Sequence, residues 1–197
     1  MNKIFLAGVI VFLSLPFTVG LAQNKYQGFN GFISFFSSAP LEDIYAENEK
    51  VKSLINLSTN EVAFVVTISG FEFKKALMQE HFNEKYMESH KYPRASFSGK
   101  LTSAADLQSP GKHEVVVKGD IEIHGVKKTI EVPGTIHNKG DQLIAESEFY
   151  LKPADFDIKI PKLLIKNIAE KVLVKVKLEY KSKKQQSKES QDMKQPG

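Results

Sequence analysis

Alternation of apolar and polar side chains is the feature of this sequence that most constrains its fold. Across residues 26–180 the prevailing repeat is two residues, which is the repeat of a β-strand with two different faces. Segment 62–69 gathers its largest apolar side chains on one face, and segment 120–124 alternates strictly. Segment 171–181 separates valine, leucine and tyrosine from lysine and glutamate. The pattern predicts strands with one buried apolar face and one solvent-exposed polar face.

Turn sequences divide these predicted strands. Their spacing suits antiparallel hairpins better than crossover helices, so the sequence predicts an all-β meander. A meander can hide its apolar faces by stacking as a sandwich or by closing into a barrel, and the period does not choose between the two. The turn sequences are Ser109-Pro110-Gly111, His124-Gly125, Pro133-Gly134 and Asn138-Lys139-Gly140-Asp141.

One segment, residues 74–90, does not alternate. Its apolar side chains recur at steps of three and four, and Tyr92-Pro93 prevents a helix from continuing. We therefore expect one short helix inserted among the strands, with its apolar face resting on the open end or flank of the sheet. That face comprises Leu77, Met78, Phe82 and Tyr86.

Residues 1–22 are predicted to be a secretory signal peptide. Lys3 precedes an apolar run over 4–13, and Gly20 and Ala22 put small residues at the positions that signal peptidase reads. The run is too short to span a bilayer, and we expect no stable membrane span after the signal is removed. The chain is therefore expected to be exported.

The two ends also account for the positive charge of the chain, which has 27 Lys and Arg against 23 Asp and Glu. Residues 181–197 are rich in Lys, Gln and Ser and are predicted to be a disordered tail. The part between leader and tail is neutral and holds a single arginine, Arg94, so we expect no nucleic-acid partner. With no cysteine, the chain has no disulfide, thiol nucleophile or thiolate metal site.

Catalytic and metal-binding patterns are missing from the sequence. The five histidines lack metal-ligand spacing, and Glu80, Glu84 and Glu88 step by four as the solvated face of a helix does. No serine lies in a nucleophile motif, and no glycine-rich phosphate loop occurs. We therefore expect that the protein is not an enzyme and that it binds no metal ion and no cofactor. The abundant phenylalanines indicate an apolar core or the lining of a wide interior.

Three segments resemble one known family. Residues 71–97 contain a helix with leucine and phenylalanine followed by Tyr92-Pro93 and Phe97, and they are similar to the signature stretch of the YceI-like family. The segments 119–128, with its Ile-His-Gly, and 155–158, Asp-Phe-Asp-Ile, match the family's later motifs in the same order. The resemblance extends over residues 23–180.

The resemblance implies an antiparallel lipocalin-like barrel of about eight strands, with the one inserted helix at about 74–90. Its apolar tunnel would hold a long isoprenoid lipid, a quinone or a comparable amphiphile, for sequestration or transport. The family also implies a periplasmic location, although secretion beyond it fits the same signal peptide. Whether two copies form a homodimer is left open. On this basis the expected tunnel residues are Phe64, Val66, Ile68, Leu77, Phe82, Tyr86, Phe97, Ile121 and Ile123.

The family's usual Arg-Asp pair before the helix leucine is replaced here by Lys74-Lys75-Ala76. Lys74 and Lys75 are the candidates for contact with a ligand head group. Two other functions remain open at this point. One is an exported β-sheet interaction module with a solid core and no ligand. The other is a small-molecule enzyme on the same barrel, which requires Glu80, His81 or Tyr86 to point inward.

Overall fold

The computed structural model describes residues 25–38, 42–103, 106–160 and 170–182. Strands dominate this part of the chain, with one short α-helix and three single turns of other helix types. The strands are β1 (Lys25–Ser37), β2 (Ile44–Asn48), β3 (Val51–Asn56), β4 (Glu61–Thr67), β5 (Glu72–Phe73), β6 (Arg94–Thr102), β7 (Gly111–Ile123), β8 (Val126–Asn138), β9 (Gln142–Leu151) and β10 (Val172–Ser182). The helical elements are η1 (Ile68–Gly70), α1 (Ala76–His81), the π-helical turn η2 (Phe82–Tyr86) and η3 (Pro153–Phe156).

Eight of these strands close into an antiparallel barrel. Round the barrel they follow the order β1, β3, β4, β6, β7, β8, β9, β10, and β10 pairs with β1 to close the circle. The closing ladder runs from Tyr26 opposite Ser182 to Phe36 opposite Leu173, so it joins the first and last strands over most of their length. The predicted all-β barrel is confirmed, and closure is the alternative that these one-sided strands adopt.

Strand β1 changes partner part-way along its length. Its first residues pair with β3, its last residues pair with β2, and β5 adds to the far side of β2. The buried side chain of Asn48 lies at the break between β2 and β3. Its Oδ1 accepts from the backbone N–H of Lys50 at 2.7 Å, and its Nδ2 donates to the carbonyl of Thr67 at 2.9 Å. These bonds satisfy a buried amide and fix the break.

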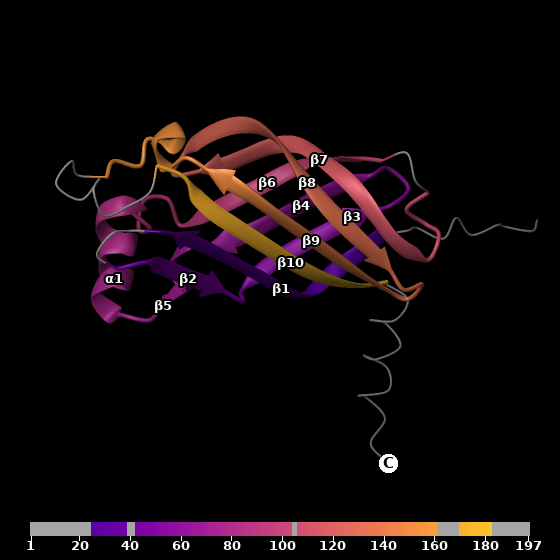
Figure 1. Ribbon diagram of the computed structural model, residues 1–197, viewed down its shortest axis with the longest axis horizontal. Coiled ribbons are helices and arrows are strands. Elements are labelled where there is room, and N and C mark those ends of the chain that lie inside the picture. The colour runs from indigo at the N-terminus through magenta and orange to yellow at the C-terminus, as the bar shows by residue number, and fades with distance from the viewer. Residues whose placement is uncertain (1–24, 39–41, 104–105, 161–169, 183–197) are drawn as a thin grey trace, which may run out of the picture.

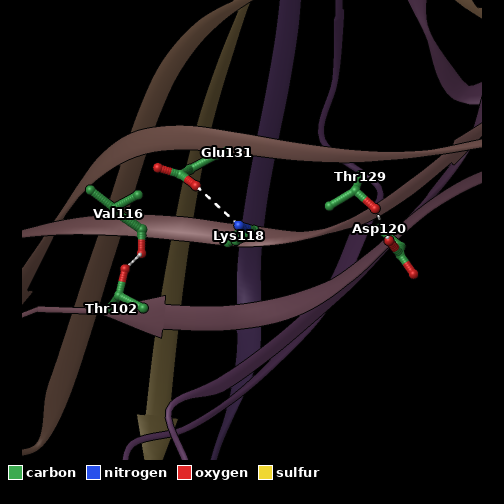
Figure 2. Close-up of polar contacts among 6 residues, drawn as sticks. All are labelled: Thr102, Val116, Lys118, Asp120, Thr129 and Glu131. Atoms are coloured by element: carbon green, nitrogen blue, oxygen red, sulfur yellow. Dashed lines mark hydrogen bonds and ion pairs between the residues drawn. The ribbon is translucent and has the colours of Figure 1, made fainter.

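The outer wall of the barrel carries the polar half of the alternating pattern. Lys118 of β7 faces Glu131 of β8 with 3.6 Å between Nζ and Oε2, and Thr129 Oγ1 donates to Asp120 Oδ1 at 2.7 Å (Figure 2). These pairs lie directly across the β7–β8 ladder. Side chains one position along β7, such as Val117 and Ile121, therefore point into the barrel.

The sequence Pro133-Gly134 is not a turn, and this prediction was wrong. Strand β8 runs through it without interruption, with Pro133 opposite Val116 of β7. The neighbouring ladder between β8 and β9 begins only at Thr135. Because the backbone ladder to β9 does not extend to Pro133, a residue without an N–H is tolerated there, and Ser147 Oγ of β9 donates to its carbonyl at 2.6 Å.

The inserted helix covers one end of the barrel, at the left of Figure 1. The α-helical part is shorter than the predicted 74–90, because α1 ends at His81 and the chain continues as η2. In η2 the N–H of Met87 donates to the carbonyl of Phe82 at 2.8 Å, five residues back. A π-helical turn of this kind lies at functional sites in many proteins.

The predicted signal peptide, residues 1–22, and most of the predicted tail lie outside the described residues. Strand β10 extends through Lys181 and Ser182, two residues past the predicted end of the domain. Within the described ranges, the molecule has no helix of the length and apolar character that a membrane crossing requires.

Candidate ligand-binding cavity

A cavity of about 430 Å³ occupies the half of the barrel next to α1. Its wall is almost entirely aliphatic and aromatic, and it comes from β-strands on all sides, from α1 and η2, and from η3. Cavities of several hundred Å³ with such walls are typical sites for small apolar ligands. The lining includes Ile33, Phe35, Ile44, Phe64, Val66, Ile68, Phe71, Phe73, Met78, Phe82, Met87, Ala95, Ile121, Ile123, Phe149, Leu151, Phe156, Ile158, Val172 and Val174.

The inner end of the cavity lies near the middle of the barrel. Phe64, Ile121 and Phe149 line both this cavity and a second void of about 70 Å³ in the other half. Phe97 lines the second void and stacks on Phe64, with 5.4 Å between ring centroids and 18° between ring planes. These side chains lie where the two spaces adjoin.

An aromatic cluster attaches the inserted helix to the barrel. The Phe82 ring of η2 lies 5.5 Å from the rings of Phe35 and Phe71 and 5.0 Å from that of Phe73, between centroids. Because all four rings line the cavity, the contacts that hold the helix also form the ligand-facing wall. Tilted and offset pairs at these separations are the favourable aromatic arrangements.

A few polar side chains interrupt the apolar wall, among them Ser34, Ser37 and Ser96 on the strands. The lining contains the carboxylate of Glu42, the imidazole of His81 and the phenol of Tyr86. Glu42 is already paired, because Lys75 Nζ lies 2.6 Å from its Oε2. Burial raises the pKa of Tyr86 above its ordinary value, and its hydroxyl can donate a hydrogen bond.

A buried histidine joins three elements beside the cavity. His124 Nδ1 lies 3.1 Å from the carbonyl oxygen of Phe156, and because a carbonyl only accepts, Nδ1 is the donor. His124 Nε2 lies 3.0 Å from Glu88 Oε2, and its ring lies 4.4 Å from that of Tyr92. His124 and Gly125 both have positive φ, at 52° and 74°. The turn thus ties the β7–β8 hairpin to the end of η2 and to η3.

The chain matches the model of the YceI-like domain family over residues 22–180. This match covers all of the barrel except the last two residues of β10. The chain belongs to the YceI-like family. No curated protein matches the sequence.

Solved structures share the fold of this YceI-like chain at low sequence identity. A polyisoprenoid-binding domain from Saccharophagus degradans has a TM-score of 0.68 and 15% identity, covering 81% of this chain and 99% of that one. Burkholderia cenocepacia BcnA has a TM-score of 0.66 and 15% identity, covering 76% and 95%. The Campylobacter jejuni YceI protein has a TM-score of 0.57 and 13% identity, covering 70% and 84%.

The structure of the YceI-like chain brings most of the predicted tunnel residues to the cavity. Leu77 is outside the lining and 62% exposed, and Phe97 lines the smaller void instead. Lys75 pairs with Glu42 at the helix end of the cavity, and Lys74 is exposed on the same segment. The predicted residues that do line the cavity are Phe64, Val66, Ile68, Phe82, Tyr86, Ile121 and Ile123.

Several lining residues of the YceI-like barrel were not predicted as site residues. Phe149 and Leu151 of β9, and Val172 and Val174 of β10, follow the alternation that identified the others. The same period of two is the signal that would have found them. Phe156 is different, because it enters the cavity from η3, where no strand period operates.

The described residues contain no group of three or more His, Asp or Glu side chains placed to hold a metal ion. The enzyme alternative requires a polar cluster at the inner end of the cavity, with Glu80, His81 or Tyr86 pointing inward. His81 and Tyr86 do line the cavity, whereas Glu80 is exposed. Both lie on the helix at the outer end. The inner end is formed by Phe64, Ile121 and Phe149.

Proposed function

We propose that this protein is an exported, non-enzymatic carrier that holds an isoprenoid lipid, or an amphiphile of similar shape, in the cavity of its barrel. The cavity of about 430 Å³ with an apolar wall carries this proposal. Membership of the YceI-like family and the fold shared with a polyisoprenoid-binding domain support it. Export to the periplasm or beyond is part of the proposal and rests on the predicted signal peptide.

The size of the cavity argues against the interaction module with a solid core. Protein interiors are packed at the density of organic crystals, and voids larger than a water molecule are few. An unfilled apolar space of this volume leaves contacts unmade along its whole wall. A hydrophobic chain in the cavity would restore them, and each Å² of apolar surface removed from water would contribute about 25 cal/mol.

The helix end of the cavity favours an uncharged head group. The described lining holds the Glu42 carboxylate and no lysine or arginine, and the nearby Lys75 already neutralises Glu42. A phosphate in the cavity would meet this carboxylate, whose lysine partner is already engaged, and Lys74 lies outside the lining. An alcohol or a quinone carbonyl could instead exchange hydrogen bonds with Tyr86 or His81.

The test is to purify the protein from an exporting host without detergent and to record its native mass spectrum. Organic extraction and lipid analysis would then identify the bound molecule. We expect a stoichiometric adduct with the mass of an isoprenoid alcohol or a quinone. A bare protein that also takes up no added isoprenoid would overturn the proposal and favour the interaction module.

Two neighbouring valines of β4 supply a matched pair of variants. Val66 lines the cavity and is 3% exposed, whereas Val65 points outward and is 36% exposed. Val66→Phe fills part of the cavity without adding charge, so we expect it to lower ligand occupancy at least tenfold. Val65→Phe should retain wild-type occupancy. Thermal melts of both variants show whether a loss of ligand reflects a loss of fold.

A further inference from the structure

We infer that four side chains in a layer across the barrel limit the length of the chain that the cavity accepts. This floor layer consists of Phe64, Phe97, Ile121 and Phe149, from β4, β6, β7 and β9. The inference rests on the proposed function, since it specifies which isoprenoids the cavity can enclose.

The floor layer divides the interior of the barrel along its axis. Phe64, Ile121 and Phe149 line both the cavity of about 430 Å³ and the void of about 70 Å³ beyond it. Phe97 completes the layer from the far side, stacked on Phe64. Phe97 and Ile121 are both buried. A chain that enters from the helix end therefore meets packed rings before it reaches the second half of the barrel.

Two glycines leave the space that the ring of Phe97 occupies. Gly99 of β6 lies directly opposite Gly119 of β7, and a Cβ on either would lie 2.8 Å from Cζ of Phe97. The ring therefore lies against bare backbone and occupies space that any other pair of residues would fill. Phe64 packs on its other side. Between backbone and stacked ring, Phe97 is a fixed floor for the cavity.

The volume above the floor suits a short chain. About 430 Å³ lies in the lower half of the range of cavities that enclose drug-sized ligands, roughly 300–1,000 Å³. Three or four isoprene units make a molecule of that class. As long as an added isoprene unit still fits inside the cavity, it buries apolar surface and raises the affinity of the protein for the chain in water by at least tenfold. Units beyond the floor limit would stay outside the barrel in water, so a chain taken from a bilayer would lose its apolar surroundings for each of them, and its uptake would fall.

The experiment offers the protein phosphatidylcholine vesicles containing prenyl alcohols of three, four, five, six and nine isoprene units at equal mole fraction. The protein is then separated from the vesicles, and the retained alcohols are quantified. We expect uptake to be highest at three or four units and at least tenfold lower at six. Phe97→Ala, which joins the two spaces, should move this fall to a longer chain by at least one unit.

Phe36 supplies the matched control, because it is a partly exposed phenylalanine of β1 outside the cavity lining. Phe36→Ala should keep the wild-type length profile. If Phe97→Ala does not fold, Phe97→Leu opens the floor less and should shift the profile in the same direction. Equal uptake of four, six and nine units, or an unshifted profile in a folded Phe97 variant, would overturn the inference alone. Uptake of no alcohol at all, together with no bound lipid in the native mass spectrum, would overturn the proposed function with it.

Discussion

His124 shows how one side chain can organise an end of the barrel. Its ring contacts the carbonyl of Phe156, the carboxylate of Glu88 and the ring of Tyr92, each from a different segment. The Ile-His-Gly segment of the sequence is therefore more than a hairpin turn here. Its positive φ values make the turn, and its imidazole joins the turn to the wall of the cavity.

Replacing His124 with Asn tests this role at the level of one residue. Asn tolerates positive φ, so the variant removes the contacts while keeping the backbone conformation. We expect the free energy of unfolding to fall by about 2 kcal/mol, because a buried carbonyl loses its donor and the carboxylate of Glu88 loses its partner. Urea unfolding measures the change. Glu88→Gln should cost less, and the double variant should cost less than the sum; strict additivity would argue against the contact.

Tyr180 makes the stability of the barrel fall with rising pH in the alkaline range. The side chain is fully buried, its hydroxyl lies beside that of Ser53, and neither hydroxyl makes a hydrogen bond of good geometry within the described residues. Burial raises the pKa of Tyr180 from 10 to about 12, and Ser53 offsets a small part of this rise. Between these values the unfolded chain loses the phenolic proton and the folded chain keeps it, so stability falls as pH rises.

The variant Tyr180→Phe removes this dependence. At pH 8 we expect its stability to differ from wild type by less than about 1 kcal/mol, since the lost hydroxyl is poorly bonded. Above pH 10 the wild type should lose up to about 1.4 kcal/mol per pH unit that the variant does not lose. Urea midpoints of both proteins at pH 8 and pH 11 measure the difference. Equal losses in the two proteins would contradict the assignment to Tyr180.

At the scale of elements, the inserted helix depends on a single ring for much of its attachment. Phe82→Ala deletes three ring contacts at the boundary of α1 and η2. We expect a loss of about 3 kcal/mol, concentrated in local opening of α1 and η2. Hydrogen exchange should therefore quicken in residues 76–86 and stay slow in β7 and β8. Leu77→Ala, on the exposed side of α1, is the control and should cost less than about 0.5 kcal/mol.

The strands were more predictable than the helix, for a geometric reason. A period of two leaves only two faces, so once Phe64 faces inward, Val62 and Val66 must follow it. A helical spacing of three and four includes neighbours such as Leu77 and Met78, which point about 100° apart, and the sequence does not say which one meets the barrel. The structure turns Met78 inward. The π-helical turn that follows has no signal in the apolar pattern.

At the scale of the whole molecule, the sequence implied a barrel through its resemblance but could not place the floor across it. Phe64 and Phe97 both read as inward side chains of neighbouring strands. Only their pairing in three dimensions, with Gly99 and Gly119 facing each other beneath Phe97, brings the two rings together in the proposed floor layer. Registers between strands distant in sequence set the length of the cavity, and local pattern does not specify them.

The ladder between β1 and β10 has a consequence for the timing of assembly. It joins the first and last strands of the domain, so it is among the contacts of longest sequence separation in the chain. Contacts of this kind form slowly, because a long loop must close before they contribute any energy. Val172 and Val174 of β10 are also part of the cavity wall. A chain that lacks β10 therefore has no enclosed cavity, and under the proposed function ligand binding must follow the completion of the whole domain.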